Sequence, residues 1–117
     1  MTRILLAEDD ESLRGFLARA LERAGFEVKA CADGEEAVAE LDDRWDLLLT
    51  DIVMPGMDGI EVARLAAARQ PDMRIMFITG FAAVALTAAQ ASPQAKVLSK
   101  PVHLRDLVNE VERMVAA

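Results

Sequence analysis

Side chains able to do chemistry follow four short apolar runs of this 117-residue chain. They are the carboxylates of Glu8, Asp9 and Asp51, the hydroxyl of Thr79 and the ammonium group of Lys100. If the apolar runs are parallel strands, their carboxyl ends meet at one edge of a sheet, which is where open parallel sheets bind ligands. The spacing therefore predicts three carboxylates, a hydroxyl and a lysine gathered at that edge.

Carboxylates held this close repel one another, and one of them takes up a proton unless a cation neutralises the group. Oxygen ligands with open coordination positions suit Mg²⁺, which commonly shares its coordination with a phosphate. The chain has no glycine-rich phosphate loop, no Cys/His cluster and no Ser-His-Asp set. A phosphate would then be held by the metal, Lys100 and Thr79, and a neighbouring carboxylate could attack phosphorus to give an aspartyl phosphate.

Each residue taken alone also has an ordinary structural explanation. Asp51 is a common turn former, Thr79-Gly80 could simply begin a loop, and Lys100 could be a solvated surface charge. Asp10, the third of three consecutive acids, is expected to cap the helix that follows it. The convergence of the candidates at one sheet edge favours the functional interpretation over the separate ones.

The elements that must position these residues alternate between strand and helix five times. Strands are expected at residues 3–7, 26–31, 46–50, 74–78 and 96–98, with a helix after each of them. Gly25 ends the first helix, Asp33 and Asp58 cap the second and third, and the second runs through Leu41. The alternation predicts a doubly wound α/β fold with a five-stranded parallel sheet, as one domain over residues 1–117 without an output domain.

Two apolar patterns predict which residues of these elements are buried. Leu47-Leu48-Leu49 is continuous rather than alternating, which is typical of a strand buried on both faces. The first helix repeats apolar residues at helical spacing, which predicts one buried face made of Leu13, Phe16, Leu17, Ala20, Leu21 and Ala24. Trp45 and Cys31 are also expected to pack in the interior.

Composition and charge argue against several functional classes. The net charge is −7, which disfavours binding to nucleic acid or to an anionic membrane surface. The single cysteine, Cys31, permits no internal disulfide, and a cytoplasmic location is expected because no signal sequence begins the chain. Residues 75–95 are uncharged over the length of a membrane span, but Gly80 and Pro93 among them favour a buried strand followed by an alanine-rich helix.

Four motifs in this order resemble the response-regulator receiver domain of two-component signalling. They are Glu8-Asp9, the segment Asp51-Ile-Val-Met-Pro-Gly-Met-Asp-Gly, Thr79-Gly80 and Ser99-Lys100-Pro101. The resemblance covers essentially the whole chain. It implies a flavodoxin-like, CheY-like fold with strand order 2-1-3-4-5, the order that also describes the chemotaxis receiver among doubly wound folds.

The resemblance also implies a role for each matching position. Asp51 would be the phosphoacceptor. Mg²⁺ would be bound by Asp51, directly by Asp9, through water by Glu8 and by the main-chain oxygen of Val53. Thr79 and Lys100 would each contact a phosphoryl oxygen, and the Lys100-Pro101 peptide would be cis. Of the three consecutive acids, Glu8 and Asp9 are expected to face the metal, with Asp10 as the alternative to Glu8.

One family feature is missing from this chain. Receivers often carry an aromatic residue three positions before the lysine, where Val97 stands here, and the chain has no tyrosine. Phe81 is a candidate replacement, with a buried core phenylalanine as the alternative. The uncharged helix at residues 82–91, together with the fifth strand and the last helix, is the expected output surface, unless it is only a mobile alanine helix.

Together these expectations predict that the chain works as a signalling switch rather than as an enzyme. A sensor histidine kinase or histidine phosphotransfer protein would supply the phosphoryl group, and a downstream protein would bind the output surface. An aspartyl phosphatase is disfavoured because Val53 stands where such enzymes place an acid, and a phosphate shuttle or sink remains the alternative. The sequence is broadly similar to the CpdR-type stand-alone receivers, and this resemblance implies a role as adaptor in regulated proteolysis with a AAA+ protease system as partner. The small apolar end Val115-Ala116-Ala117 is what an unfolding protease could engage, with an ordinary helix end as the alternative.

Overall fold

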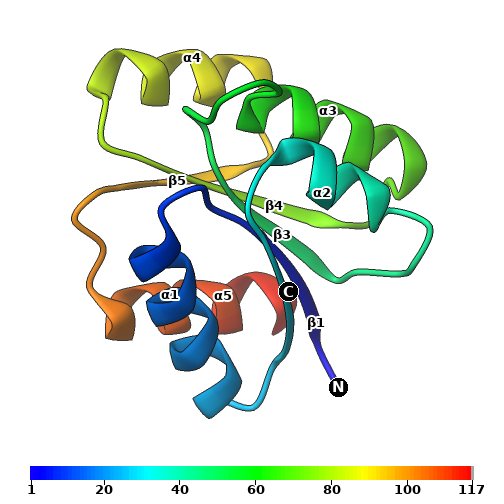
Figure 1. The fold of residues 1–117 in the computed structure, drawn as a ribbon, viewed down its shortest axis with the longest axis vertical. Coiled ribbons are helices and arrows are strands. Elements are labelled where there is room, and N and C mark those ends of the chain that lie inside the picture. The colour runs from blue at the N-terminus through cyan, green and yellow to red at the C-terminus, as the bar shows by residue number, and fades with distance from the viewer. Residues whose placement is uncertain (117) are drawn as a thin grey trace.

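The computed structural model describes residues 1–116 and contains one parallel sheet of five strands (Figure 1). The strands are β1 (Arg3–Ala7), β2 (Glu27–Cys31), β3 (Leu47–Asp51), β4 (Arg74–Thr79) and β5 (Lys96–Ser99). Their order is β2-β1-β3-β4-β5, which confirms the predicted fold class and strand order. Strands β3, β4 and β5 each end one residue later than expected, so Asp51 and Thr79 are the last residues of their strands.

Five helices cover the two faces of this sheet. They are α1 (Glu11–Arg23), α2 (Gly34–Ala39), α3 (Gly59–Arg69), α4 (Ala82–Ala91) and α5 (Leu104–Ala116). Helices α2, α3 and α4 lie on one face, and α1 and α5 lie on the other (Figure 1). Asp10, Asp33 and Asp58 cap α1, α2 and α3, because each side chain accepts a hydrogen bond from a backbone N–H three residues on. Helix α2 ends two residues before the expected Leu41.

Alternating side chains of the strands form two separate cores. Leu5, Leu48 and Phe77 pack with α2, α3 and α4, whereas their sequence neighbours pack with α1 and α5. All five residues of β3 are buried, which confirms that this strand is covered on both faces. Trp45 also packs in the interior, and its indole N–H donates to the main-chain oxygen of Glu40.

Two phenylalanines are more exposed than the sequence predicted. Phe16 was expected on the buried face of α1 but is 53% exposed, because only Leu17 and Leu21 of this helix are fully buried. A helix that packs on one sheet face and beside one neighbour buries a narrower stripe than the predicted six residues. Phe81 is 59% exposed, so the alternative of a buried core phenylalanine is wrong.

The uncharged stretch at residues 75–95 consists of most of β4, helix α4 and the turn that leads toward β5. This matches the expected buried strand and alanine-rich helix. Across residues 1–116, every helix is too short or too polar to cross a bilayer.

Cys31 ends β2 and is buried, as expected for a small interior residue. Burial raises the pKa of its thiol to about 11, and the nearby acids Glu36 and Glu40 add to the shift. Because only the thiolate reacts with disulfide reagents, we expect folded protein at pH 8 to react with a chromogenic disulfide roughly 100-fold more slowly than protein in denaturant. Stopped-flow absorbance measures both rates, and equal rates would contradict the buried placement.

Candidate functional site

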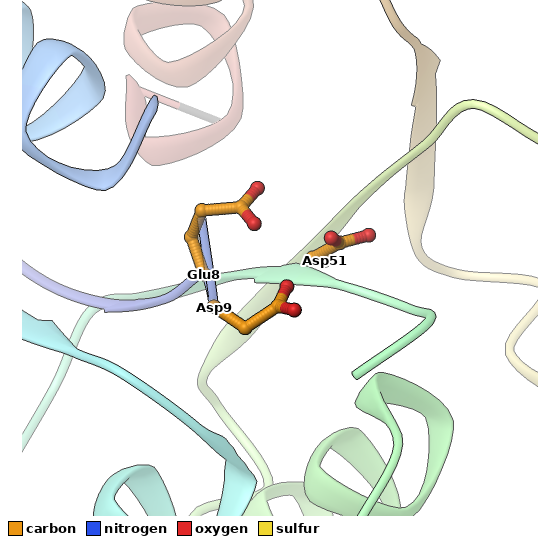
Figure 2. Close-up of side chains that lie close together, drawn as sticks. All are labelled: Glu8, Asp9 and Asp51. Atoms are coloured by element: carbon orange, nitrogen blue, oxygen red, sulfur yellow. The ribbon is translucent and has the colours of Figure 1, made fainter. Parts of the chain in front are cut away.

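Three carboxylates from two neighbouring strands meet at the carboxyl edge of the sheet. Glu8 and Asp9 follow β1, and Asp51 ends β3, the adjacent strand in which Thr50 pairs with Ala7. One carboxylate oxygen from each residue lies within 4.8 Å of the others, and the side chains of Glu8 and Asp9 extend toward Asp51 (Figure 2). Glu8 is fully buried, Asp51 is 5% exposed and Asp9 is open to solvent.

Lys100 joins this cluster from the residue after β5. Its Nζ lies 3.0 Å from Asp51 Oδ2 and 3.2 Å from Glu8 Oε1, so one ammonium group bridges two buried carboxylates. Its backbone N–H donates to the main-chain oxygen of Thr79 at 2.8 Å, which fixes the residue beside the end of β4. The Lys100-Pro101 peptide is cis, as the resemblance implied.

The charges in this cluster act strongly on one another. Burial raises the pKa of Glu8 to about 7, because removal from water disfavours the charged form, and the negative charge of Asp51 acts in the same direction. Burial alone would lower the pKa of Lys100, but the hydrogen bond and charge of Asp51 and the charge of Glu8 raise it. The site therefore holds a charged lysine beside a glutamate that titrates near neutral pH.

A cation fits the one buried oxygen of this cluster that accepts no hydrogen bond from the described residues. Glu8 Oε2 accepts a hydrogen bond from the Asp10 N–H at 3.1 Å, whereas Oε1 is buried and accepts none from any residue among 1–116. Lys100 Nζ near Oε1 is an ion-pair contact without hydrogen-bond geometry. A buried, unsatisfied carboxylate oxygen beside two further carboxylates is a donor set that suits a hard divalent cation.

The other predicted site residues lie around this cluster. Thr79 is buried at the end of β4, and its Oγ1 accepts a hydrogen bond from the Phe81 N–H at 3.2 Å. Val53 lies in the loop after β3 with its side chain about half exposed. Asp10 turns toward α1, where its carboxylate accepts from the Leu13 N–H, so Glu8 rather than Asp10 belongs to the carboxylate cluster.

Gly59 begins α3 in close contact with the backbone of Asp51. A Cβ at this position would lie 2.1 Å from the main-chain oxygen of Asp51, so only glycine permits the approach. The Gly59 N–H also donates to the main-chain oxygen of Ile52 at 2.8 Å. The Asp58-Gly59 pair thus caps α3 and fixes the backbone that carries Asp51. The position of this pair directly after the Pro-Gly loop could have predicted this role from the sequence.

Two further contacts were missed by the sequence analysis. Arg14 of α1 donates from Nη1 to the main-chain oxygen of Glu8 at 2.9 Å, which holds the segment that carries two of the acids. Glu35 of α2 accepts from the Met57 N–H at 3.1 Å and so holds the loop that follows Asp51. Neither spacing matches a local pattern, because the bonded residues are 6 and 22 positions apart in the sequence.

The geometry agrees with what comparison with known proteins shows. The family model of the response regulator receiver domain matches residues 4–112. The chain belongs to the response-regulator receiver family. Receivers are phosphorylation switches of two-component signalling that obtain the phosphoryl group from histidine kinases. They bind Mg²⁺ at an acidic pocket, and the cluster of Glu8, Asp9 and Asp51 is such a pocket in this chain.

Individual relatives differ in how much of their own length this chain matches. This receiver is 60% identical to the response regulator receiver protein CpdR of Brucella abortus (strain 2308) over 119 residues, covering 100% of this chain and 99% of that protein. It is 34% identical to the sensor kinase CckA of the same organism, where it covers 96% of this chain but only 12% of the kinase. The first relative is therefore similar over its full length, and the second only over a small part.

Solved receiver structures share the same arrangement. A CheY-like receiver domain protein from Methanospirillum hungatei JF-1 superposes with a TM-score of 0.92 at 30% identity, covering 99% of this chain and 94% of that one. The response regulator TrrA from Thermotoga maritima, solved in complex with Mg(2+)-BeF, superposes with a TM-score of 0.87 at 28% identity, covering 97% and 99%. These similarities confirm the predicted CheY-like fold.

The raised pKa of Glu8 predicts a pH dependence of stability. The folded state holds this proton up to about pH 7, whereas an unfolded glutamate loses it near pH 4.5, so the stabilisation is complete below pH 4.5 and is lost as the pH rises through 7. The Glu8→Gln variant has no such proton to lose. In metal-free protein, its free energy of unfolding minus that of wild type should therefore be about 1–2 kcal/mol larger at pH 8 than at pH 5.

Urea denaturation in EDTA at several pH values measures this difference. Glu22→Gln is the matched control because Glu22 is exposed on α1, outside the cluster, and loses the same formal charge. A Glu8→Gln difference that stays constant with pH would contradict the assignment of the raised pKa to Glu8.

Proposed function

We propose that this receiver accepts one phosphoryl group on Asp51 and thereby changes its binding to a protein partner. The observation that carries the proposal is the position of the Asp51 carboxylate. It is almost fully buried, lies 3.0 Å from Lys100 Nζ and faces two further acids. A carboxylate in this setting combines nucleophilic oxygen with cationic groups that can neutralise the charge of a phosphoryl group.

In the proposed reaction, a carboxylate oxygen of Asp51 attacks phosphorus of a phosphohistidine in a sensor histidine kinase or histidine phosphotransfer protein. An O–P bond forms as the N–P bond breaks, and the electron pair returns to the imidazole of the donor. Lys100 pairs with a phosphoryl oxygen. The Thr79 hydroxyl can donate a hydrogen bond to a second phosphoryl oxygen, because the bond it makes here, with the Phe81 N–H, uses Oγ1 only as acceptor. Because such kinases and phosphotransfer proteins would have to reach Asp51, the proposal includes a cytoplasmic location for this receiver.

Four groups would hold Mg²⁺ in this proposal. Asp9 and Asp51 would bind it directly, Glu8 would bind it through water, and Val53 would contribute its main-chain oxygen. When bound, the ion supplies positive charge that neutralises the carboxylates and the phosphoryl oxygens. The unsatisfied Oε1 of Glu8 supports this set. No acid stands two residues after Asp51, so the proposal includes slow loss of the phosphoryl group rather than enzymatic turnover.

The proposed output surface consists of α4, β5 and α5. Helix α4 carries no charged residue, only its Ala88 is fully buried, and Leu86 is 62% exposed. The hydrogen bond from the Phe81 N–H to Thr79 Oγ1 links the hydroxyl that would bind the phosphoryl group directly to the residue before the first turn of this helix. Movement of Thr79 toward a phosphoryl oxygen would therefore move Phe81, which would take the place of the missing aromatic residue at Val97.

A partner in a AAA+ protease system is part of this proposal because the chain is similar to CpdR over its full length, and the CpdR-type resemblance implies an adaptor role in regulated proteolysis. The apolar C-terminal residues Ala116 and Ala117, of which Ala117 lies outside the described residues, would be one contact for such a machine. Replacing both alanines with aspartate should lengthen the cellular lifetime of the protein. An unchanged lifetime would exclude the tail as a recognition element.

Incubation with acetyl phosphate and Mg²⁺, followed by intact mass measurement, tests the proposed phosphorylation. We expect the mass of one phosphoryl group to be gained, and none when EDTA replaces Mg²⁺. A pull-down that compares phosphorylated with unmodified protein separates the switch from a phosphate shuttle or sink. Different retained proteins support the switch, whereas retention of histidine phosphotransfer proteins alone supports the shuttle.

A further inference from the structure

The backbone of Glu8 is held from both sides. Its N–H donates to the main-chain oxygen of Cys31 at 3.1 Å, which extends the pairing of β1 with β2 one residue past Ala7. Its main-chain oxygen accepts a hydrogen bond from Arg14 Nη1 of α1 at 2.9 Å. That oxygen belongs to the planar peptide that joins Glu8 to Asp9, so the oxygen and the Asp9 N–H turn together. The Arg14 guanidinium therefore fixes the orientation of the peptide between the two acids.

The first turn of α1 places Arg14 within reach of this peptide. Asp10 accepts the Leu13 N–H through its carboxylate and the Arg14 N–H through its main-chain oxygen, both at 2.8 Å. Long side chains of a helix point back toward its N-terminus, and the Arg14 side chain follows this direction to Glu8, two residues before the cap. Residues 8–14 therefore form a closed loop between the end of β1 and the capped start of α1.

The Asp9 side chain has no hydrogen bond of its own to direct it. Among residues 1–116, no group donates to its carboxylate, and the side chain is open to solvent. Glu8 differs, because its Oε2 accepts from the Asp10 N–H and its Oε1 lies 3.2 Å from Lys100 Nζ. The direction of the Asp9 carboxylate thus depends on the backbone that carries it, and so on the peptide that Arg14 holds.

Arg14 contacts this main-chain oxygen rather than an acid. Within the described part of the chain it forms no ion pair, and the cation that bridges Asp51 and Glu8 is Lys100. A hydrogen bond from an ionised donor is shorter and stronger than one between neutral groups, and this one is partly buried. It therefore restricts rotation of the peptide between Glu8 and Asp9 without pairing with either carboxylate.

We propose that Arg14 is a positioning residue for Mg²⁺. Its hydrogen bond to the Glu8 main-chain oxygen keeps the Asp9 carboxylate directed toward Asp51 before the ion binds. Ligands that are already in place bind an ion more tightly, because the free energy of ordering them is not taken from binding. The inference rests on the proposed function and deepens it, since it names a residue that would touch neither the ion nor the phosphoryl group.

Positioning and charge predict opposite effects of removing Arg14. A nearby cation repels Mg²⁺, so loss of its charge alone would tighten Mg²⁺ binding. Loss of positioning weakens it, and isothermal titration calorimetry should give Arg14→Met a Kd for Mg²⁺ about 3- to 10-fold higher than wild type. Arg14→Lys, which can still donate to the oxygen, should recover part of this loss. Arg19→Met removes the same charge from an exposed position on α1 and should bind Mg²⁺ no more weakly than wild type.

Metal-free protein supplies a second readout that does not depend on phosphorylation. In two-dimensional NMR, the Asp9 amide should shift in Arg14→Met and keep its wild-type position in Arg19→Met, because only the first variant loses the bond to that peptide. Similar midpoints of urea unfolding show that a variant is folded. Arg14→Gln repeats the comparison with a polar side chain that is too short to reach the oxygen.

The outcomes separate this inference from the proposed function. An unshifted Asp9 amide, unchanged or tighter Mg²⁺ binding by Arg14→Met and Arg14→Gln, or an equal loss of affinity in Arg19→Met would overturn the positioning role. If the variants bind Mg²⁺ in the expected order but wild type gains no phosphoryl group from acetyl phosphate, the positioning role stands and the proposed function is wrong.

Discussion

Asp51→Asn protein is expected to keep its unmodified mass after incubation with acetyl phosphate and Mg²⁺, under conditions in which wild type gains one phosphoryl group. An amide has nearly the shape of a carboxylate and can still contact Lys100, so the variant should fold. The amide oxygen lacks the negative charge that makes Asp51 a nucleophile, and the expected loss is therefore complete rather than partial.

Asp58→Asn is the matched control for this experiment. Asp58 lies in the loop that follows β3 and caps α3, and it loses the same charge as Asp51 in the variant. Asparagine is as good a cap as aspartate, so α3 should remain intact and phosphorylation should continue at the wild-type rate. A phosphoryl group on Asp51→Asn protein would instead assign the acceptor to another acid, with Asp9 as the nearest accessible candidate.

The meeting of Asp51 with Glu8 and Asp9 was predictable because strand order leaves few alternatives. Both strands are short, apolar and parallel, and every parallel neighbour ends at the same edge of the sheet. The choice between Glu8 and Asp10 was predictable for a local reason, since Asp10 stands where a helix needs a cap. Local rules and topology together therefore specified the members of the carboxylate cluster.

Features that depend on packing were not predictable in the same way. The exposure of Phe16 follows from how much of α1 the sheet and α5 cover, and helical spacing alone does not determine this width. The bonds from Arg14 to Glu8 and from Met57 to Glu35 join residues without a shared periodicity. A cavity between α3 and α4 is lined by Ala63 and Ala67 of α3 and by Ala91 of α4. Each helix by itself has an ordinary helix-forming sequence, so neither predicts the space between them.

Asp9→Asn should bind Mg²⁺ roughly 10- to 100-fold more weakly than wild type, because a dication loses one of the negative charges that face it at short range. Isothermal titration calorimetry measures the affinity directly. Asp10→Asn is the control: it removes the same charge from the next residue, but its side chain caps α1 and lies outside the cluster. It should bind Mg²⁺ nearly as wild type does.

The same pair of variants separates a metal ligand from a nucleophile. Asp9→Asn should be phosphorylated slowly at low Mg²⁺ and recover toward the wild-type rate as Mg²⁺ is raised, because saturation offsets a weaker affinity. Asp51→Asn should stay unmodified at every Mg²⁺ concentration, because no amount of metal restores the missing nucleophile. If Asp9→Asn and Asp10→Asn weakened Mg²⁺ binding equally, the ion would be responding to the overall charge of this loop, and the carboxylate cluster would not be its site.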